Sequence, residues 1–573
     1  MKKINFKLFA VIILAAGVLA SCGVNRMVRN YDEGVRYTPE TNPLENHGGE
    51  VEANVEGVIS EGYFHRNAVM ELTPVLKYED GEKELETVRL RGTNTTTQGN
   101  MVDGDSQTTF DLNNLIGFEP ELMASELYIK GRVFREGRED NASELNERKV
   151  ADGIIVTSQR VKDDHFVSIA PHEYEEEVII TETADIYFAY MRHNLNWRLD
   201  LNSQDEAQER IENLKEFLDR GWELKAVDIH AWASPEGEVA FNMELSEDRA
   251  ATAEDYITEV FEDLEVDMPE FRVEAKGEDF DGFMTKLDAS DLPDKQAIAN
   301  VINTQEDPAE RERKIKDMTL IYEEVEKLLE PLRRAEISVH AYEPKFSYEE
   351  LSELAIEDPA ELTEEELLFA ATLTEDKQTR LEIYENAKEL FPNSYKGFNN
   401  AAAILLEIGE VEQAAQDLEK ANQLAPGNGH IQNNLGVAAA WEKDIENAES
   451  LFRSARAQGI NVDYNLGVIH IQKGDYEDAL SSLSEYTCTY NLALAQLMAG
   501  NESAAVNTLN CSPECADVAY LKAIIAARNN EVTNLYDNLR RAIEINSDMA
   551  ECARRDREFI EFFGQSEFQE IIR

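Results

Sequence analysis

The feature that most constrains this chain is a repeat of helical residues in its C-terminal third. Pro392 and Pro426 lie 34 residues apart, and small and large apolar residues return at matched positions after each of them. Small residues on one helix let its neighbour approach, and large residues fill the space that remains. Because no single helical hairpin can bury its own apolar face, such pairs must stack. The repeat therefore predicts an all-α solenoid over residues 381–573.

The repeated set resembles the tetratricopeptide (TPR) motif. One period carries Phe398, Gly409, Ala414, Leu418 and Ala421, and the next carries Leu435, Gly436, Ala448, Phe452 and Ala455. A third copy begins at Tyr464, a shortened fourth at Asn491 and a degenerate fifth at Tyr520. The resemblance implies a groove for a peptide or a partner protein. A solenoid that docks only onto its own chain remains the alternative.

The first 22 residues predict a cleaved leader and a lipid anchor. Lys2, Lys3 and Lys7 precede the apolar run 8–20, which is too short to span a bilayer comfortably. The small residues before Cys22 resemble the lipobox of bacterial lipoproteins, which implies lipidation of Cys22 after removal of the signal peptide 1–21. An ordinary secretory leader is the alternative. No acidic cluster follows Cys22, and in the Bacteroidota lipoproteins that the chain resembles, this favours the periplasmic face of the outer membrane.

The rest of the chain divides by composition into further parts. Residues 22–50 are polar with scattered Pro and Gly, which predicts a tether. Residues 51–174 carry short β-rich runs separated by turn residues, which predicts an all-β, sandwich-like domain. Residues 175–342 mix strands and helices in an α+β plan, and residues 343–380 predict a helical linker.

A motif within the α+β region resembles the OmpA-like peptidoglycan-binding domain. After the strand 227–232, the spacing from Gly237 to Asn242, Leu245 and Arg249 agrees with the family pattern, and 332–335 matches its closing strand. In that family an aspartate and an arginine hold the diaminopimelate of the peptidoglycan stem. Arg249 matches the arginine, but Ser234 stands at the aspartate position, so half of the clamp is missing. Glu236 is near enough in sequence to replace it. Ser234, Asn242 and Arg249 are therefore candidates for binding peptidoglycan or a protein partner.

Charge, cysteines and motifs narrow the function further. The chain has 55 basic and 115 acidic residues, a net charge of −60, which disfavours nucleic acid as a partner. Four cysteines lie near the C-terminus, Cys488, Cys511, Cys515 and Cys552. They are expected to pair in an oxidising compartment, with three connectivities possible and a local Cys511–Cys515 bridge among them. The cysteines lack zinc spacing, and the sequence shows no recognisable catalytic motif. We expect no metal, no cofactor and no enzymatic activity.

These observations together predict a multidomain lipoprotein anchored in the outer membrane. It would serve as a periplasmic scaffold or adaptor that binds proteins through its TPR repeats, within an envelope export or outer-membrane assembly complex. One alternative is a lipoprotein that tethers peptidoglycan through the OmpA-like domain. Another is a surface glycan-binding lipoprotein, which would need exposed aromatic side chains.

Overall fold

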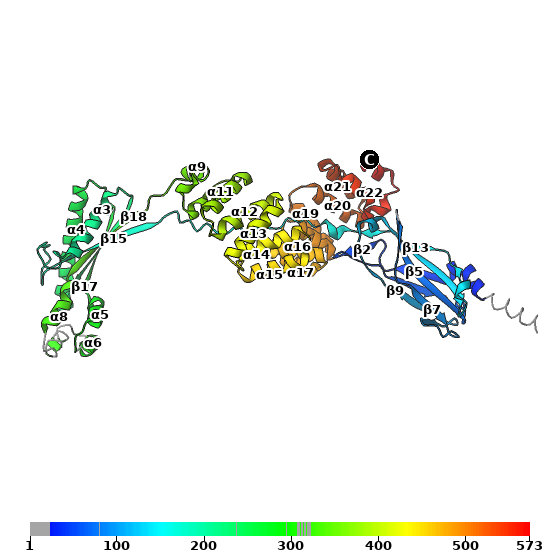
Figure 1. The fold of residues 1–573 in the computed structure, drawn as a ribbon, viewed down its shortest axis with the longest axis horizontal. Helices are drawn as coiled ribbons and strands as arrows, with labels where there is room; N and C mark the ends of the chain where they lie inside the picture. The colour runs from blue at the N-terminus through cyan, green and yellow to red at the C-terminus, as the bar shows by residue number, and fades with distance from the viewer. Residues whose placement is uncertain are drawn as a thin grey trace, which may run out of the picture. The chain divides into compact units, whose positions relative to one another are not determined.

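The computed structural model describes residues 23–573 except 80, 237, 294, 306, 308, 309, 311, 312, 315, 316 and 318–321. The lipobox and Cys22 lie outside the described residues. The chain forms two compact units, Met1–Pro171 together with Thr374–Arg573, and His172–Leu373 (Figure 1). Unit 2 is thus inserted in sequence between the two halves of unit 1. No helix within the described residues is long and apolar enough to cross a membrane.

The N-terminal half of unit 1 is rich in β-sheet. Three sheets have the strand orders β1-β4-β9, β10-β3-β2-β14 and β12-β11-β5-β7-β8, and β13 and β6 pair with β11 and β5. The strands are β1 Val35–Pro39, β2 Leu44–His47, β3 Glu50–Glu52, β4 Val55–Ile59, β5 Ala68–Tyr78, β6 Gly81–Glu84, β7 Val88–Gly92, β8 Asn100–Val102, β9 Thr108–Leu112, β10 Leu115–Gly117, β11 Glu126–Arg135, β12 Ser143–Glu144, β13 Arg148–Ala151 and β14 Ile154–Ile155. All three sheets contribute to one apolar core. The domain is therefore all-β as predicted, but it packs three sheets together where a sandwich packs two.

The prediction of a tether over residues 22–50 is wrong for the described part of that range. Residues 31–52 form α2 (Tyr31–Gly34) and the strands β1, β2 and β3. Met27, Tyr31, Val35 and Leu44 are at most 1% exposed and belong to the core of the β domain. Composition did not reveal this, because the few apolar residues of the segment pack against strands far along the chain.

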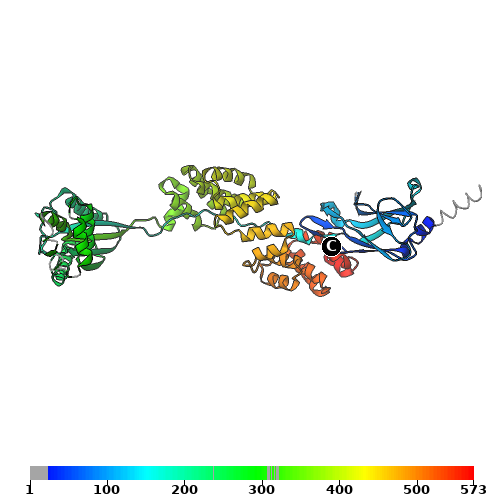
Figure 2. The same cartoon turned by 90° about the horizontal axis from the view of Figure 1, so that it is seen from below.

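The C-terminal half of unit 1 is a stack of antiparallel helix pairs, seen from below in Figure 2. The helices are α11 Lys377–Leu390, α12 Tyr395–Ile408, α13 Val411–Leu424, α14 Gly429–Trp441, α15 Ile445–Ala457, α16 Asp463–Lys473, α17 Tyr476–Ser482, α18 Tyr490–Met498, α19 Glu502–Cys511, α20 Ala516–Arg528, α21 Val532–Ile545, α22 Met549–Arg555 and α23 Ser566–Ile571. Gly409 and Gly474 end α12 and α16 with φ of 86° and 82°, which a residue with a Cβ rarely adopts.

The predicted packing positions of the solenoid are confirmed. Ala414, Leu418, Ala421, Ala448 and Phe452 are all 0% exposed within one apolar cluster. Gly436 lies against the ring of Phe452, where a Cβ would approach the ring to 2.7 Å. The solenoid therefore follows the alternation of small and large residues that the repeat predicts.

Unit 2 contains a four-stranded sheet with the order β15-β18-β16-β17. Its elements are β15 Ile179–Tyr187, α3 Asp205–Asp219, β16 Leu224–Ala233, α4 Val239–Asp263, β17 Glu270–Glu278, α5 Phe280–Ala289, α6 Lys295–Thr304, α8 Tyr322–Leu329 and β18 Arg334–Tyr342. β16 and β17 are parallel and joined through α4, while β18 pairs antiparallel with β15 and β16. Alternate residues of β16 and β18 are buried, as expected for a sheet with one face on a core.

The segment predicted as a helical linker contains two helices with well-formed starts. α9 (Tyr348–Glu357) begins with a capping box between Ser347 and Glu350, and α10 (Glu364–Ala370) begins with one between Thr363 and Glu366. Each box satisfies backbone N–H groups that a helix leaves without a partner at its first turn. The segment folds with unit 2 as far as Leu373.

Candidate binding sites

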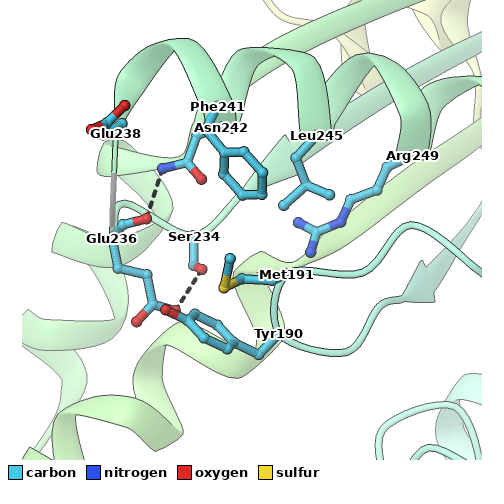
Figure 3. A pocket seen from close by; sticks show the side chains of 9 residues that line it. All are labelled: Tyr190, Met191, Ser234, Glu236, Glu238, Phe241, Asn242, Leu245 and Arg249. Carbon is cyan, nitrogen blue, oxygen red and sulfur yellow. Dashed lines mark hydrogen bonds between the residues drawn. The ribbon is translucent and has the colours of Figure 1, made fainter.

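The three site residues predicted in unit 2 lie together around one pocket. Its volume is about 270 Å³, and the α4 side chains Phe241, Asn242, Leu245 and Arg249 form one wall (Figure 3). The lining also includes Tyr190, Met191, Ser234, Glu236 and Glu238. The spacing along α4 places its four residues on one face, because positions three and four apart are neighbours on a helix.

Arg249 is held at the base of this pocket by backbone carbonyls. It is 1% exposed and donates to the carbonyl oxygens of Arg192, Trp232 and Ala189 at 3.0, 2.8 and 3.3 Å. Burial, and next the repulsion of Arg333, lower the pKa of Arg249 to about 10. These bonds fix the guanidinium in place. Arg249 therefore has a structural role in unit 2 in addition to its candidate role in binding.

Glu236 supplies the negative charge that Ser234 lacks. The Ser234 hydroxyl donates to the Glu236 carboxylate at 2.8 Å, and Arg333 forms an ion pair with that carboxylate at 2.8 Å. Asn242 donates to the backbone oxygen of Glu236 at 2.8 Å. Glu236 is therefore already paired by Arg333, whereas Arg249 faces the pocket with three carbonyl oxygens and the Phe188 ring, 5.3 Å from the ring centroid, as its partners. Arg249 lines the pocket beside Glu236, which Arg333 pairs, and the exposed Glu238, so its guanidinium can take an anionic group of a ligand.

The mouth of the pocket is apolar. Tyr190, Met191 and Phe241 are 49%, 52% and 41% exposed. The sequence analysis did not single out these residues. Phe241 could have been predicted from the sequence, because it lies one helical turn before Leu245. The loop that carries Tyr190 and Met191 has no periodic pattern from which to predict them.

A second site, which the sequence analysis missed, lies on the solenoid. The chain segment 160–170, here called the strap, runs along α20, α18, α16, α14 and α12 in that order. Six asparagines on four of these helices contact its backbone, and we call this set the asparagine ladder: Asn399, Asn400, Asn433, Asn434, Asn465 and Asn491. The ladder side chains are at most 1% exposed, so each bond is shielded from water.

Four asparagines of the ladder each hold both the N–H and the C=O of one strap residue. Asn400 holds Ala170 at 2.7 and 3.1 Å. Asn434 holds Ser168 at 2.7 and 2.8 Å, and Asn465 holds Phe166 at the same two distances. Asn491 holds Lys162 with both bonds at 2.9 Å. Residues 166, 168 and 170 are two apart, which is the period of an extended chain.

Side chains anchor the two flanks of the strap. Arg160 lies over the ring of Tyr520, 3.9 Å from its centroid, and pairs with Asp556 at 2.9 Å. Ser168 hydrogen bonds to His430 at 2.8 Å. The expectation that residues 51–174 form one β domain is thus wrong beyond Ile155, because the chain leaves the sheets there and joins the solenoid.

The structure shows which of the four C-terminal cysteines form a disulfide. Cys488 and Cys511 form a disulfide with their Cα atoms 5.3 Å apart, while Cys515 and Cys552 are free thiols. The local Cys511–Cys515 bridge is therefore not formed. Across the residues that the structure describes, histidine, cysteine and acidic side chains do not gather in threes as metal ligands would.

Comparison with known proteins gives solved helical-repeat structures. No family model and no curated protein matches the chain. A tetratricopeptide repeat protein from Parabacteroides merdae ATCC 43184 is 16% identical, with a TM-score of 0.28 over 39% of this chain and 89% of its own. PilW, a type IV pilus biogenesis factor, is 15% identical, with a TM-score of 0.28 over 39% and 99%. Pseudomonas aeruginosa pilF is 16% identical, with a TM-score of 0.27 over 39% and 97%.

These likenesses cover 39% of the chain at 15–16% identity and with TM-scores below 0.3. The description of the solenoid as a TPR-like stack therefore rests on its own helix pairs and packing residues. The chain is multidomain, with a sheet-rich N-terminal region and a C-terminal helical solenoid.

Proposed function

We propose that this protein is a lipid-anchored scaffold of a bacterial cell envelope, at the periplasmic face of the outer membrane. It binds other proteins through its solenoid, as a component of an envelope export or outer-membrane assembly complex, and it is not an enzyme. The observation that carries the proposal is the stack of helix pairs α11 to α21, because stacked repeats offer long binding surfaces to proteins.

The anchor would bring the β domain close to the bilayer. Val24 and Met27, 8% and 0% exposed, already pack in the core of that domain, so little chain separates Cys22 from folded structure. Acylation of Cys22 would therefore seat the β domain against the membrane without a flexible spacer. Cys22→Ser should leave the protein soluble after cell fractionation; a membrane-bound Cys22→Ser protein would contradict the anchor.

In this structure the strap occupies the asparagine ladder of the solenoid, so a partner would first contact the remaining exposed surface of the helices. Exposed apolar side chains remain on the solenoid, among them Trp441 and Ile545, which are 43% and 42% exposed at the ends of α14 and α21. A photo-crosslinking residue at the exposed positions Glu412 or Glu477 should capture partner proteins in intact cells. The matched position Glu56, exposed on β4, should not. Capture from Glu56 alone would place the binding surface on the β domain instead.

Peptidoglycan tethering is the second candidate, and the pocket of unit 2 favours it. The positive charge of Arg249 beside an apolar mouth suits a carboxylate carried on a larger molecule. Wild-type protein should then sediment with purified peptidoglycan, and Arg249→Lys should weaken this, since an ammonium cannot reach the three carbonyls and a ligand together. Arg210→Lys, at a half-exposed position of α3, is the control. Failure of the wild type to sediment would reject this function.

A further inference from the structure

The asparagine ladder binds mainly the main chain of the strap, and one of its members, Asn491, also donates to the Asp164 carboxylate at 2.8 Å. At Lys162, Phe166, Ser168 and Ala170, the clamping bonds go to N–H and C=O groups that every residue except proline possesses. Such a site accepts extended segments of differing sequence, as in the recognition of peptides by strand pairing.

The strap is an imperfect occupant of this site. Both ring nitrogens of His165 are buried, and neither makes a hydrogen bond of good geometry among the described residues, with Asn465 as the polar neighbour of the ring. The ring packs against Phe452, with the ring centroids 5.7 Å apart, where an apolar side chain would fit without that cost. Phe166, although large and apolar, is 50% exposed. A segment of better sequence would bind the ladder more tightly, residue for residue, than the strap does.

We propose that the strap is a built-in competitor, and that the asparagine ladder is the docking site for an extended segment of a partner protein. This inference rests on the proposed scaffold function and names the surface and the kind of partner. The strap holds the site through its covalent connection, which gives it a high effective concentration. A partner segment displaces it by binding better in the same register.

The site also sets the chemistry of the partner segment. Lys162 of the strap pairs with Asp517 at 3.0 Å, so a basic residue is expected at that position. Four residues further along, at the position of Phe166, an aromatic ring can stack on Tyr464, as Phe166 does with centroids 4.2 Å apart. At the position of His165 an apolar residue should be favoured. Between these positions, Tyr464 donates to the Asp164 carboxylate at 2.8 Å and Lys443 pairs with Asp163, so acidic residues are expected there. The partner is therefore an extended peptide with a basic residue, then acidic residues and then apolar residues, and it carries no proline where the ladder needs an N–H.

Fluorescent peptides with the sequence of residues 158–172 test the proposal on the full-length protein in detergent. Ser168→Pro in the chain removes the N–H that Asn434 accepts, and Ile169→Pro removes an N–H to which no ladder residue bonds. The Ser168→Pro protein should bind the added peptide at least about tenfold more tightly than wild type, while Ile169→Pro should resemble wild type. A peptide with His165→Val should bind the Ser168→Pro protein about tenfold more tightly than the native peptide.

Several outcomes would overturn the proposal. Equal binding of the peptide by Ser168→Pro and wild type would show that the strap does not compete for the site. Equal binding of the native and His165→Val peptides would show that the strap is no poorer than an apolar occupant. If Ser168→Pro fails to fold, by circular dichroism and limited proteolysis, the strap is a structural part that no partner can displace. Because the assay uses peptide and purified protein alone, its failure leaves the co-purification of partners as a separate test of the scaffold function.

Discussion

Removal of one asparagine of the ladder should open the strap locally and leave the helices folded. Asn434→Ala removes the acceptor of the Ser168 N–H, 2.7 Å away, and the donor to Asn399 Oδ1, 3.1 Å away. The Ser168 carbonyl keeps a bond from Asn399 Nδ2 at 3.0 Å. Two buried polar groups are therefore left without partners, at about 1–3 kcal/mol each, so a total of roughly 2–4 kcal/mol is expected after some relief by water.

Hydrogen–deuterium exchange measures this cost directly. A loss of roughly 2–4 kcal/mol should speed exchange of the Phe166, Ser168 and Ala170 amides by roughly 30- to 1000-fold, if they exchange by local opening. Asn447→Ala, at an exposed position of α15, is the control and should change none of them. Exchange at Ser168 within threefold of wild type would refute the reasoning, and a uniform increase across α20 as well would point to global unfolding instead.

Three further changes have expected outcomes. Arg333→Met leaves the Glu236 carboxylate buried without its 2.8 Å ion pair and should destabilise unit 2 by roughly 3–5 kcal/mol in urea denaturation. Cys488→Ser with Cys511→Ser opens a disulfide with a sequence separation of 23 residues and should cost about 3 kcal/mol in the same measurement. Burial lowers the pKa of His165 from its usual 6.5 to about 4. Between these two pH values the unfolded chain is protonated at His165 and the folded chain is not. Stability of the strap should therefore fall by roughly 3 kcal/mol as the pH falls from 6.5 to 4, and His165→Val should remove this dependence in exchange measurements.

Each of these outcomes has its own control. Arg210→Met, on the surface of α3, should leave the urea midpoint unchanged; an equal loss in both variants would contradict the buried pair at Arg333. Cys552→Ser, at an exposed free thiol, should be neutral, and equal stability of the double variant would count against the disulfide. If His165→Val keeps the full pH dependence, another group than His165 is responsible.

The sequence predicted the solenoid because its packing positions recur with a fixed period. Phe452 and Ala448 are buried where the repeat places them, since small and large residues at matched positions admit few other arrangements. Asn242 and Arg249 were found through their match to the OmpA-like pattern, and the structure brings both to one pocket.

The parts that the sequence did not reveal owe their structure to distant partners. Met27 is buried by strands far along the chain, and the strap is extended because asparagines more than 200 residues away hold its backbone. Asn399 and Asn433 recur 34 residues apart, as Asn400 and Asn434 do, and this was the available signal for the ladder. No period marks the strap itself, since the ladder binds mainly its main chain.

If the solenoid of the anchored protein holds other proteins, purification of the native complex should recover them. Full-length protein should be extracted gently from envelopes with a mild detergent and analysed by size-exclusion chromatography and mass spectrometry. Defined partner proteins should elute together with the full-length protein, and those that occupy the ladder should dissociate on addition of the His165→Val peptide. Protein that runs alone as a single chain, under conditions that preserve other envelope complexes, would contradict the scaffold function.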